Sequence, residues 1–259
     1  AAVAVTPAAP PDPAGFRGTV TADVRAGSVQ VQAQPGAEAL LAGPLTLGLE
    51  GEVDMPAGQM RIARLAIDNP QLNASAKGEV DLNRRSGTLD AQARAASLSP
   101  LSPLLGLPVS GAAELTATLR AEADLRDVRA EIAGALTDLA SPQAPLQAIF
   151  GSRTTLKADL VTPNDGTHRF DIKVDAAAAD LAAKGSLTPD FGRIDAEYRV
   201  AVADLKPFSA VAGNDLAGRA TLSGTVEGPT ADPTVTAALK GGDIVVAQQP
   251  LGSVDGGLR

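Results

Sequence analysis

The sequence predicts an all-β protein with a few short helices, in which an elongated, mostly antiparallel sheet curls into an open trough. Three observations predict this fold. Apolar and polar residues alternate with a period of two along most of the 259 residues. Turn-forming residues separate the alternating stretches. A pattern of about 107 residues also recurs along the chain.

The predicted strands are clearest in four stretches, where apolar residues occupy every second position and mostly Thr, Glu, Asp, Lys or Arg lie between them. These stretches are 45–50, 113–120, 170–175 and 194–200. Such alternation gives a strand one apolar and one wet face, as antiparallel sheets allow. Turns are predicted between strands by Gly, Pro, Asn and Asp. The predicted turns are 84–87, 163–166, 190–192 and 241–243.

Short helices are predicted where the alternation breaks. The four stretches are Ala37–Ala42, Leu98–Leu105, Leu136–Phe150 and Leu205–Ala212. The rest is predicted to be a β-meander. A single sheet with one apolar face must cover that face by closing into a barrel, by adding a second sheet, or by curling into a trough.

The internal repeat divides the chain. Lys77-Gly78 recurs 107 positions later as Lys184-Gly185. The same shift matches Leu98, Pro100, Ser102, Gly111, Leu115 and Val128 with Leu205, Pro207, Ser209, Gly218, Leu222 and Val235. A two-residue offset is expected near Gly87 and Gly192. We predict a Pro/Ala-rich linker at 1–14, the end of a preceding repeat at 15–36, and β-groove repeats at 37–144 and 145–259.

Composition narrows the function classes. The net charge of -8, with 30 Asp+Glu against 22 Lys+Arg, disfavours a nucleic-acid partner, because phosphates need a basic footprint. The absence of Cys removes disulfides, thiolate metal sites and Cys nucleophiles. No apolar run reaches 18 residues, so no membrane-spanning helix is expected. The ends, without an initiator Met or a closing turn, favour a piece of a longer protein.

No catalytic chemistry is evident in the sequence. The single histidine, His168, is predicted to be a solvated residue on a turn. Metalloprotease, nucleophile-elbow, P-loop and EF-hand spacings do not occur. Asp23, Asp171, Asp175 and Asp195 are interpreted as solubilising residues. We therefore predict no enzyme activity, no metal site and no cofactor.

The apolar positions of the predicted strands are the candidate binding residues. They are Leu45, Leu47, Leu49, Leu89, Leu115, Leu119, Ile172, Val174, Ile194, Tyr198, Val200, Leu222 and Leu239. With only 2% aromatic residues, such a surface would hold hydrocarbon without recognising a head group. Transfer at about 0.8 kcal/mol per CH₂ makes it attractive to acyl chains. The alternative is that these residues pack the core of a closed sandwich.

One recurring element resembles a known family. A short helix, a strand of small residues, Gly-Pro and an x-Pro-x-Val strand follow one another in Phe208–Pro229 and Asp232–Val235. Leu98–Leu119 and Glu38–Gly51 are variants of this element. From Gly15 onward the chain resembles the middle segment of the β-structured periplasmic body of the TamB family (translocation and assembly module subunit), within the AsmA-like group.

The resemblance implies a periplasmic portion of a protein anchored in the inner membrane of a Gram-negative bacterium. It implies a groove that conducts phospholipid acyl chains between the inner and outer membranes and supports outer-membrane and autotransporter protein assembly and secretion. In the full-length protein the implied partners are an outer-membrane barrel, TamA, and the inner membrane. No nucleic-acid partner is expected, and the chain is expected to be monomeric.

Other functions remain open at this stage. A non-conducting β-stalk or an adhesin-like secreted repeat protein would use the same apolar face as a closed core. An outer-membrane barrel would also alternate, but such barrels carry aromatic girdles, and the low aromatic content disfavours one. A hydrolase is the least favoured alternative.

Overall fold

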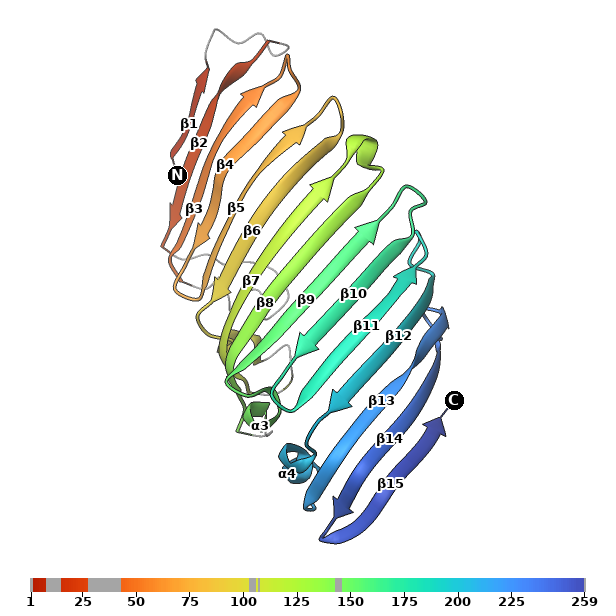
Figure 1. Ribbon diagram of the computed structural model, residues 1–259. Coiled ribbons are helices and arrows are strands. Elements are labelled where there is room, and N and C mark those ends of the chain that lie inside the picture. Colours follow the sequence, from red (N-terminus) through yellow and green to blue (C-terminus); the bar gives the residue numbers. More distant parts are fainter. Residues whose placement is uncertain are drawn as a thin grey trace. The chain divides into compact units, whose positions relative to one another are not determined.

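The alternating stretches fold into fifteen strands, which follow one another in the sheet in chain order, from β1 to β15 (Figure 1). The computed structural model describes residues 2–7, 15–27, 43–102, 106, 108–142 and 146–258. The strand pairs within these residues are antiparallel, and each joins neighbours in the chain. The predicted all-β, open and mostly antiparallel fold with a few short helices is confirmed.

The chain forms two compact units, which are described separately. Unit 1 comprises Ala1–Leu107 and Ala112–Ile132, and unit 2 comprises Pro108–Gly111 and Ala133–Arg259. The strands of unit 1 are β1 (Ala2–Pro7), β2 (Arg17–Ala26), β3 (Leu45–Asp54), β4 (Gln59–Asp68), β5 (Leu72–Asp81), β6 (Ser86–Ala95) and most of β7 (Ser110–Ala121). Its 3-10 helices are η1 (Ser99–Leu101) and η2 (Ala123–Leu125).

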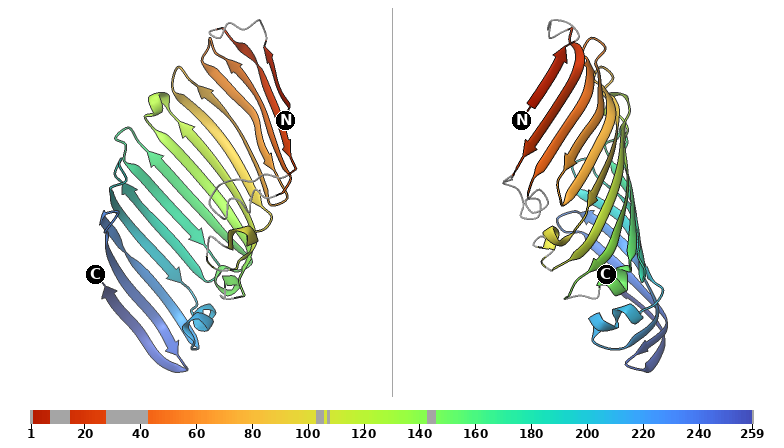
Figure 2. Two further views of the ribbon diagram at one scale, coloured as in Figure 1. Left: turned by 180° about the vertical axis from the view of Figure 1, so that it is seen from behind. Right: turned by 90° about the vertical axis from the view of Figure 1, so that its left-hand side faces the viewer.

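Unit 2 repeats this plan. Its strands are β9 (Arg153–Thr162), β10 (His168–Asp175), β11 (Ala179–Leu187), β12 (Arg193–Val202), β13 (Leu216–Pro229), β14 (Thr234–Val246) and β15 (Gln249–Leu258). The helical segments are α3 (Leu146–Phe150), η3 (Lys206–Phe208) and α4 (Ser209–Ala212). Strand β8 (Val128–Ala140) contributes residues to both units. In both views of Figure 2 the strands of each unit form one layer.

The strand register gives unit 1 one apolar and one polar face. Residues that pair directly across antiparallel strands point to the same side of the sheet, and a line of such paired residues is called a cross-strand row. One cross-strand row is Val24, Leu47, Ile67, Ala74, Ala93 and Leu115. The adjacent row is Arg25, Thr46, Asp68, Asn73, Arg94 and Glu114. A bulge between Ile62 and Leu65 changes the parity within β4, so that both residues lie on the apolar face.

Unit 2 separates its residues in the same way. One apolar row is Leu156, Val174, Leu181, Val200, Leu222 and Leu239. The adjacent row is Lys157, Lys173, Ala182, Arg199, Ser223 and Ala238. The acidic residues Asp171, Asp175 and Asp195 occupy the polar face of unit 2, and Asp23 that of unit 1.

The internal repeat is visible in the strand boundaries. Strands β6 and β12 are 107 residues apart at both ends, as are η1 and η3. The two-residue offset expected near Gly87 and Gly192 is therefore not needed to align β6 with β12. The recurring Lys-Gly pair has a steric reason, because a Cβ at Gly78 or Gly185 would overlap the carbonyl oxygen of Thr88 or Asp195 on the neighbouring strand.

The four predicted helices have different outcomes. The stretch 205–212 is helical as η3 and α4, and 98–105 contains η1, with its last residues outside those described. The stretch 37–42 also lies outside the described residues. The prediction for 136–150 is wrong in its first part, because β8 continues to Ala140. Asp138 has a φ of 50° and interrupts the alternation without ending the strand.

Two further predictions need correction. The predicted turn at 241–243 lies inside β14, where the register with β15 shifts between Gly241 and Ile244 and Asp243 has a φ of 54°. The predicted linker contains β1, which pairs with β2 from Ala2 to Pro7. The alternating sequence AVAVT favours this strand despite the prolines that follow it.

The turn between β11 and β12 is organised by Asp190. The Thr188 hydroxyl donates to its carboxylate at 2.5 Å and the Gly192 N–H at 3.0 Å. The Thr188 hydrogen bond, followed by the Gly192 bond, lowers the pKa of Asp190 below its ordinary value of 3.8. Because the folded-state pKa is lowered, these bonds stabilise the fold above pH 3.8, and their contribution is lost as the pH falls through the folded-state pKa.

We expect Thr188→Val to raise the pKa of Asp190 toward 3.8, because it removes the stronger of the two donors. Carbon-detected NMR titration of the Asp190 carboxyl measures this change. The Thr188→Val variant should also retain less stability than the parent at pH 6, and the difference should shrink below pH 3.8. An unchanged Asp190 titration would contradict this account of the turn.

Candidate functional site

The candidate binding residues share one face within each unit. In unit 1, Leu47 and Leu115 lie in one cross-strand row, and Leu89 pairs directly with Leu119. Leu45 and Leu49 alternate with Leu47 along β3 and therefore point to the same side. The pairing thus brings together all six candidates of unit 1 on its apolar face.

The seven candidates of unit 2 are also brought together. Val174, Val200, Leu222 and Leu239 belong to one cross-strand row. Ile172 and Tyr198 both pair with Ala183 and belong to the next row on the same apolar face. Ile194 lies two rows further along the same face, paired with Leu187 and Gly228.

This face is largely uncovered within the described residues. Leu115 and Leu119 are each 40% exposed and Leu239 is 42% exposed. Of the thirteen candidates only Leu45 is buried, and the remaining nine are half-buried. None of the described large side chains is fully buried, as the core of a closed sandwich would require. The described strands therefore leave a large aliphatic surface in contact with solvent.

Several members of this surface are not among the predicted residues. Leu65, Leu160, Leu181 and Val235 lie on the same apolar faces and are 38–46% exposed. Alternation around Leu160 and Leu181 is a signal that could have identified them. Leu65 follows the β4 bulge, so its face becomes clear only from the strand register.

The apolar rows contain little polar chemistry among the described positions. Tyr198 pairs with Gly224, and its hydroxyl donates to the Thr236 carbonyl at 3.0 Å, so its polar group is satisfied. His168 is the other exception, and the prediction of a solvated turn residue is wrong. It begins β10 and is half-buried, because strand alternation turns it toward the apolar side, opposite Leu187.

The His168 ring is held by two neighbours. It stacks on Phe191 with the ring centroids 4.3 Å apart, and its Nδ1 lies 2.9 Å from the Thr162 hydroxyl. Its Nε2 is buried and has no hydrogen-bond partner. The ring therefore packs as a mainly apolar element at the end of this face.

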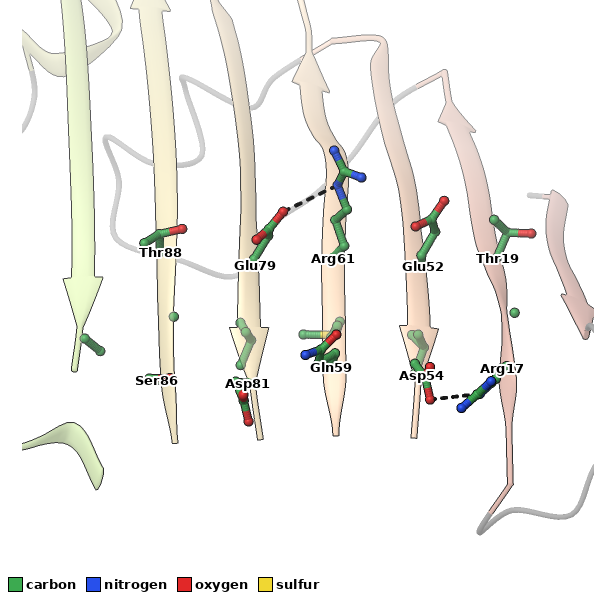
Figure 3. Close-up of a pocket in the computed structure, with 16 residues that line it drawn as sticks. Arg17, Thr19, Glu52, Asp54, Gln59, Arg61, Glu79, Asp81, Ser86 and Thr88 are labelled. Atoms are coloured by element: carbon green, nitrogen blue, oxygen red, sulfur yellow. Dashed lines mark hydrogen bonds and ion pairs between the residues drawn. The ribbon is translucent and has the colours of Figure 1, made fainter. Parts of the chain in front are cut away.

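The opposite face of unit 1 carries the charges, and a hollow of about 970 Å³ lies over β2 to β7 (Figure 3). In Figure 3 Arg17 points toward Asp54 and Arg61 toward Glu79, at 3.1 and 3.6 Å. These pairs are exposed and contribute little stability. The lining is mixed, because Val53, Met60 and Val80 lie beside the charged residues. The hollow was not predicted, because it depends on the alignment of six strands.

Arg84 and Arg85 lie in the β5–β6 turn as predicted. Arg84 approaches Asp81 at 3.8 Å. The Arg84 and Arg85 carbonyls accept hydrogen bonds from the Asp124 and Leu125 N–H groups of η2, at 2.7 and 3.2 Å. The turn is therefore tied by its backbone to the next hairpin of unit 1.

Other kinds of site find no support in the described part of the chain. No group of three or more His, Asp or Glu residues there is arranged to hold a metal ion. No helix in that part is long and apolar enough to cross a bilayer. Comparisons of the chain with protein-family models, with curated proteins and with solved structures gave no match. The uncovered apolar face is accordingly the candidate site.

Proposed function

We propose that the apolar faces of this chain bind the acyl chains of phospholipids. The observation that carries the proposal is the exposure of large aliphatic side chains, including Leu115, Leu119 and Leu239, on a face that no second described layer covers. A contiguous exposed apolar surface of this kind is typical of an interaction site. Acyl chains fit it because the described apolar rows carry no Asp, Glu, Lys or Arg.

Transfer free energy supports this choice of ligand. Each methylene group moved from water to an apolar surface gains about 0.8 kcal/mol. The same rows provide almost no hydrogen-bonding groups to fix a head group, so binding depends on chain length rather than on head-group chemistry. An amphiphile held in this way can move along the face without breaking specific polar contacts.

The wider function follows the resemblance to the TamB family. In this proposal the chain is a segment of an envelope-spanning protein that conducts phospholipid between the inner and outer membranes. It is non-enzymatic, monomeric and periplasmic, and it supports outer-membrane protein assembly together with a TamA-like barrel and the inner membrane. The alternative, a closed-core stalk, is disfavoured by the exposure of Leu115 and Leu239.

Site-specific crosslinking tests the binding proposal. A photoreactive amino acid at Leu115 or Val200 should capture phospholipid when the protein is purified from cells, because both positions lie on apolar faces. The matched controls are Glu114 and Arg199, which neighbour them in sequence and occupy the polar faces. Mass spectrometry of the crosslinked protein identifies the lipid, and native mass spectrometry measures what co-purifies.

The expected result is lipid at Leu115 and Val200 and none above background at Glu114 and Arg199. Equal capture at all four positions, or at none of them, would contradict the proposal.

A further inference from the structure

The apolar face of unit 1 contains a furrow over β5 and β6. It is an open hollow of about 160 Å³. Its floor is formed by Ala74, Ala76, Ala91 and Ala93. One wall is made by Leu65 and Ile67 of β4, and the other by Leu115 of β7. Both leucines are at least 40% exposed, so the described residues leave the walls of the furrow unpacked.

The second repeat fills the equivalent place. The row Ile67, Ala74, Ala93 and Leu115 corresponds, 107 residues later, to Val174, Leu181, Val200 and Leu222. The next row replaces Ala91 with Tyr198, while Ala76 is matched by Ala183. The walls are therefore aliphatic in both units, but larger side chains occupy three of the four floor positions in unit 2. The furrow is thus a difference between two otherwise similar repeats.

We propose that this furrow is a discrete binding site for one acyl chain, lying along β5 and β6, whereas the floor of unit 2 offers no such site. The inference rests on the proposed lipid-binding function. It adds the place on the apolar face where an acyl chain binds and the number of chains, one, that bind there. The ligand class is a single hydrocarbon chain of a lipid or fatty acid.

The size and lining of the furrow favour this ligand. An apolar cavity of about 150 Å³ accommodates benzene, so the furrow has room for about six carbon atoms of a chain. The walls belong to strands three spacings apart, or roughly 14 Å between backbones. The side chains of Ser75 and Gln92 hydrogen-bond to each other at 2.9 Å on the polar face, so they offer no partner to water in the furrow.

Palmitate carrying a mid-chain diazirine is the probe for the test. The whole chain is irradiated with this probe, and the labelled residues are mapped by mass spectrometry. We expect labelling at Leu65, Ile67 and Leu115 to exceed labelling at Ile172, Val174 and Leu222 about tenfold, because the filled floor of unit 2 removes at least two methylene contacts.

Paired variants fill the floor of unit 1 and shorten two side chains in the floor of unit 2. Ala76→Leu with Ala93→Leu fills the furrow and should remove the excess labelling in unit 1. Leu181→Ala with Val200→Ala opens the floor of unit 2 and should create labelling at Val174 and Leu222. Thr88→Leu places a leucine on the polar face of β6, outside the furrow, and should change nothing. Circular dichroism confirms that each variant is folded.

The outcomes separate this inference from the proposed function. Equal labelling of both units in the parent chain would overturn the furrow and leave the lipid-binding face intact. Labelling confined to unit 1 that survives Ala76→Leu/Ala93→Leu would also overturn it. No labelling above that of the polar face would overturn both. Because the parent chain alone gives a decisive ratio, the test does not depend on the folding of any variant.

Discussion

Leu222→Arg should reduce lipid capture by a photoreactive amino acid at the paired Val200 at least about tenfold while leaving the chain folded. Leu222 lies within an apolar row, between Val200 and Leu239. A guanidinium there places an uncompensated charge where hydrocarbon would lie, which is strongly unfavourable. Because the face is open, the aliphatic stem of the arginine can cover the strand while its head reaches water. We expect the free energy of unfolding to fall by no more than about 2 kcal/mol.

Thr221→Arg is the matched control for this prediction. Thr221 precedes Leu222 on β13 and pairs with Ala201 and Lys240 on the polar face. It should not change lipid capture, and repulsion from Lys240 should lower the free energy of unfolding by less than about 1 kcal/mol. Mass spectrometry of lipid crosslinked at Val200 gives the first quantity, and urea denaturation gives the second. Loss of folding in Leu222→Arg would indicate a closed core instead, because burying an unpaired charge costs several kcal/mol.

Alanine at the Lys-Gly glycines should destabilise the protein more than most surface changes. A Cβ at Gly78 would overlap the Thr88 carbonyl oxygen, and one at Gly185 the Asp195 carbonyl oxygen. The obstructing atoms are backbone, so the neighbouring strand itself must shift. We expect Gly78→Ala and Gly185→Ala each to cost about 1–3 kcal/mol. Thermal denaturation should show this as a decrease in Tm of roughly 2–12 °C.

Gly256→Ala provides the comparison for these two variants. Gly256 lies in β15, and no atom would lie within 4 Å of an added Cβ. Its Tm should remain within about 2 °C of the parent. If Gly78→Ala and Gly185→Ala denature at the same temperature as Gly256→Ala, the recurrence of the Lys-Gly pair has no steric origin.

Much of the fold was predictable because alternation is a local signal. The strands around Leu45–Glu50 and Ile194–Val200 lie close to where the sequence places them, and all thirteen apolar candidates occupy the apolar faces. The wrong predictions of secondary structure fall where the backbone conformation of a single residue interrupts the alternation of side chains between the two faces. The positive φ of Asp138 and that of Asp243 interrupt the alternation inside strands, which made one stretch resemble a helix and the other a turn.

The candidate site was less predictable than the fold. Leu65 was missed because the β4 bulge changes its parity, and His168 was placed in a turn although it begins a strand. The furrow over Ala74 and Ala93 could not be located, since its floor and walls come from four strands whose relative register alternation does not specify.

By itself the sequence determined that the protein is an amphipathic β-meander with a repeat of about 107 residues, because side chains alternate along a strand and turn residues punctuate it. Only the tertiary structure decided the register in which the strands pair and whether the apolar face is covered. The physical reason is that alternation assigns each residue to a side of its own strand. Rows, hollows and exposure arise from the alignment of several strands, as Leu115 beside Ala93 and Leu222 beside Val200 illustrate.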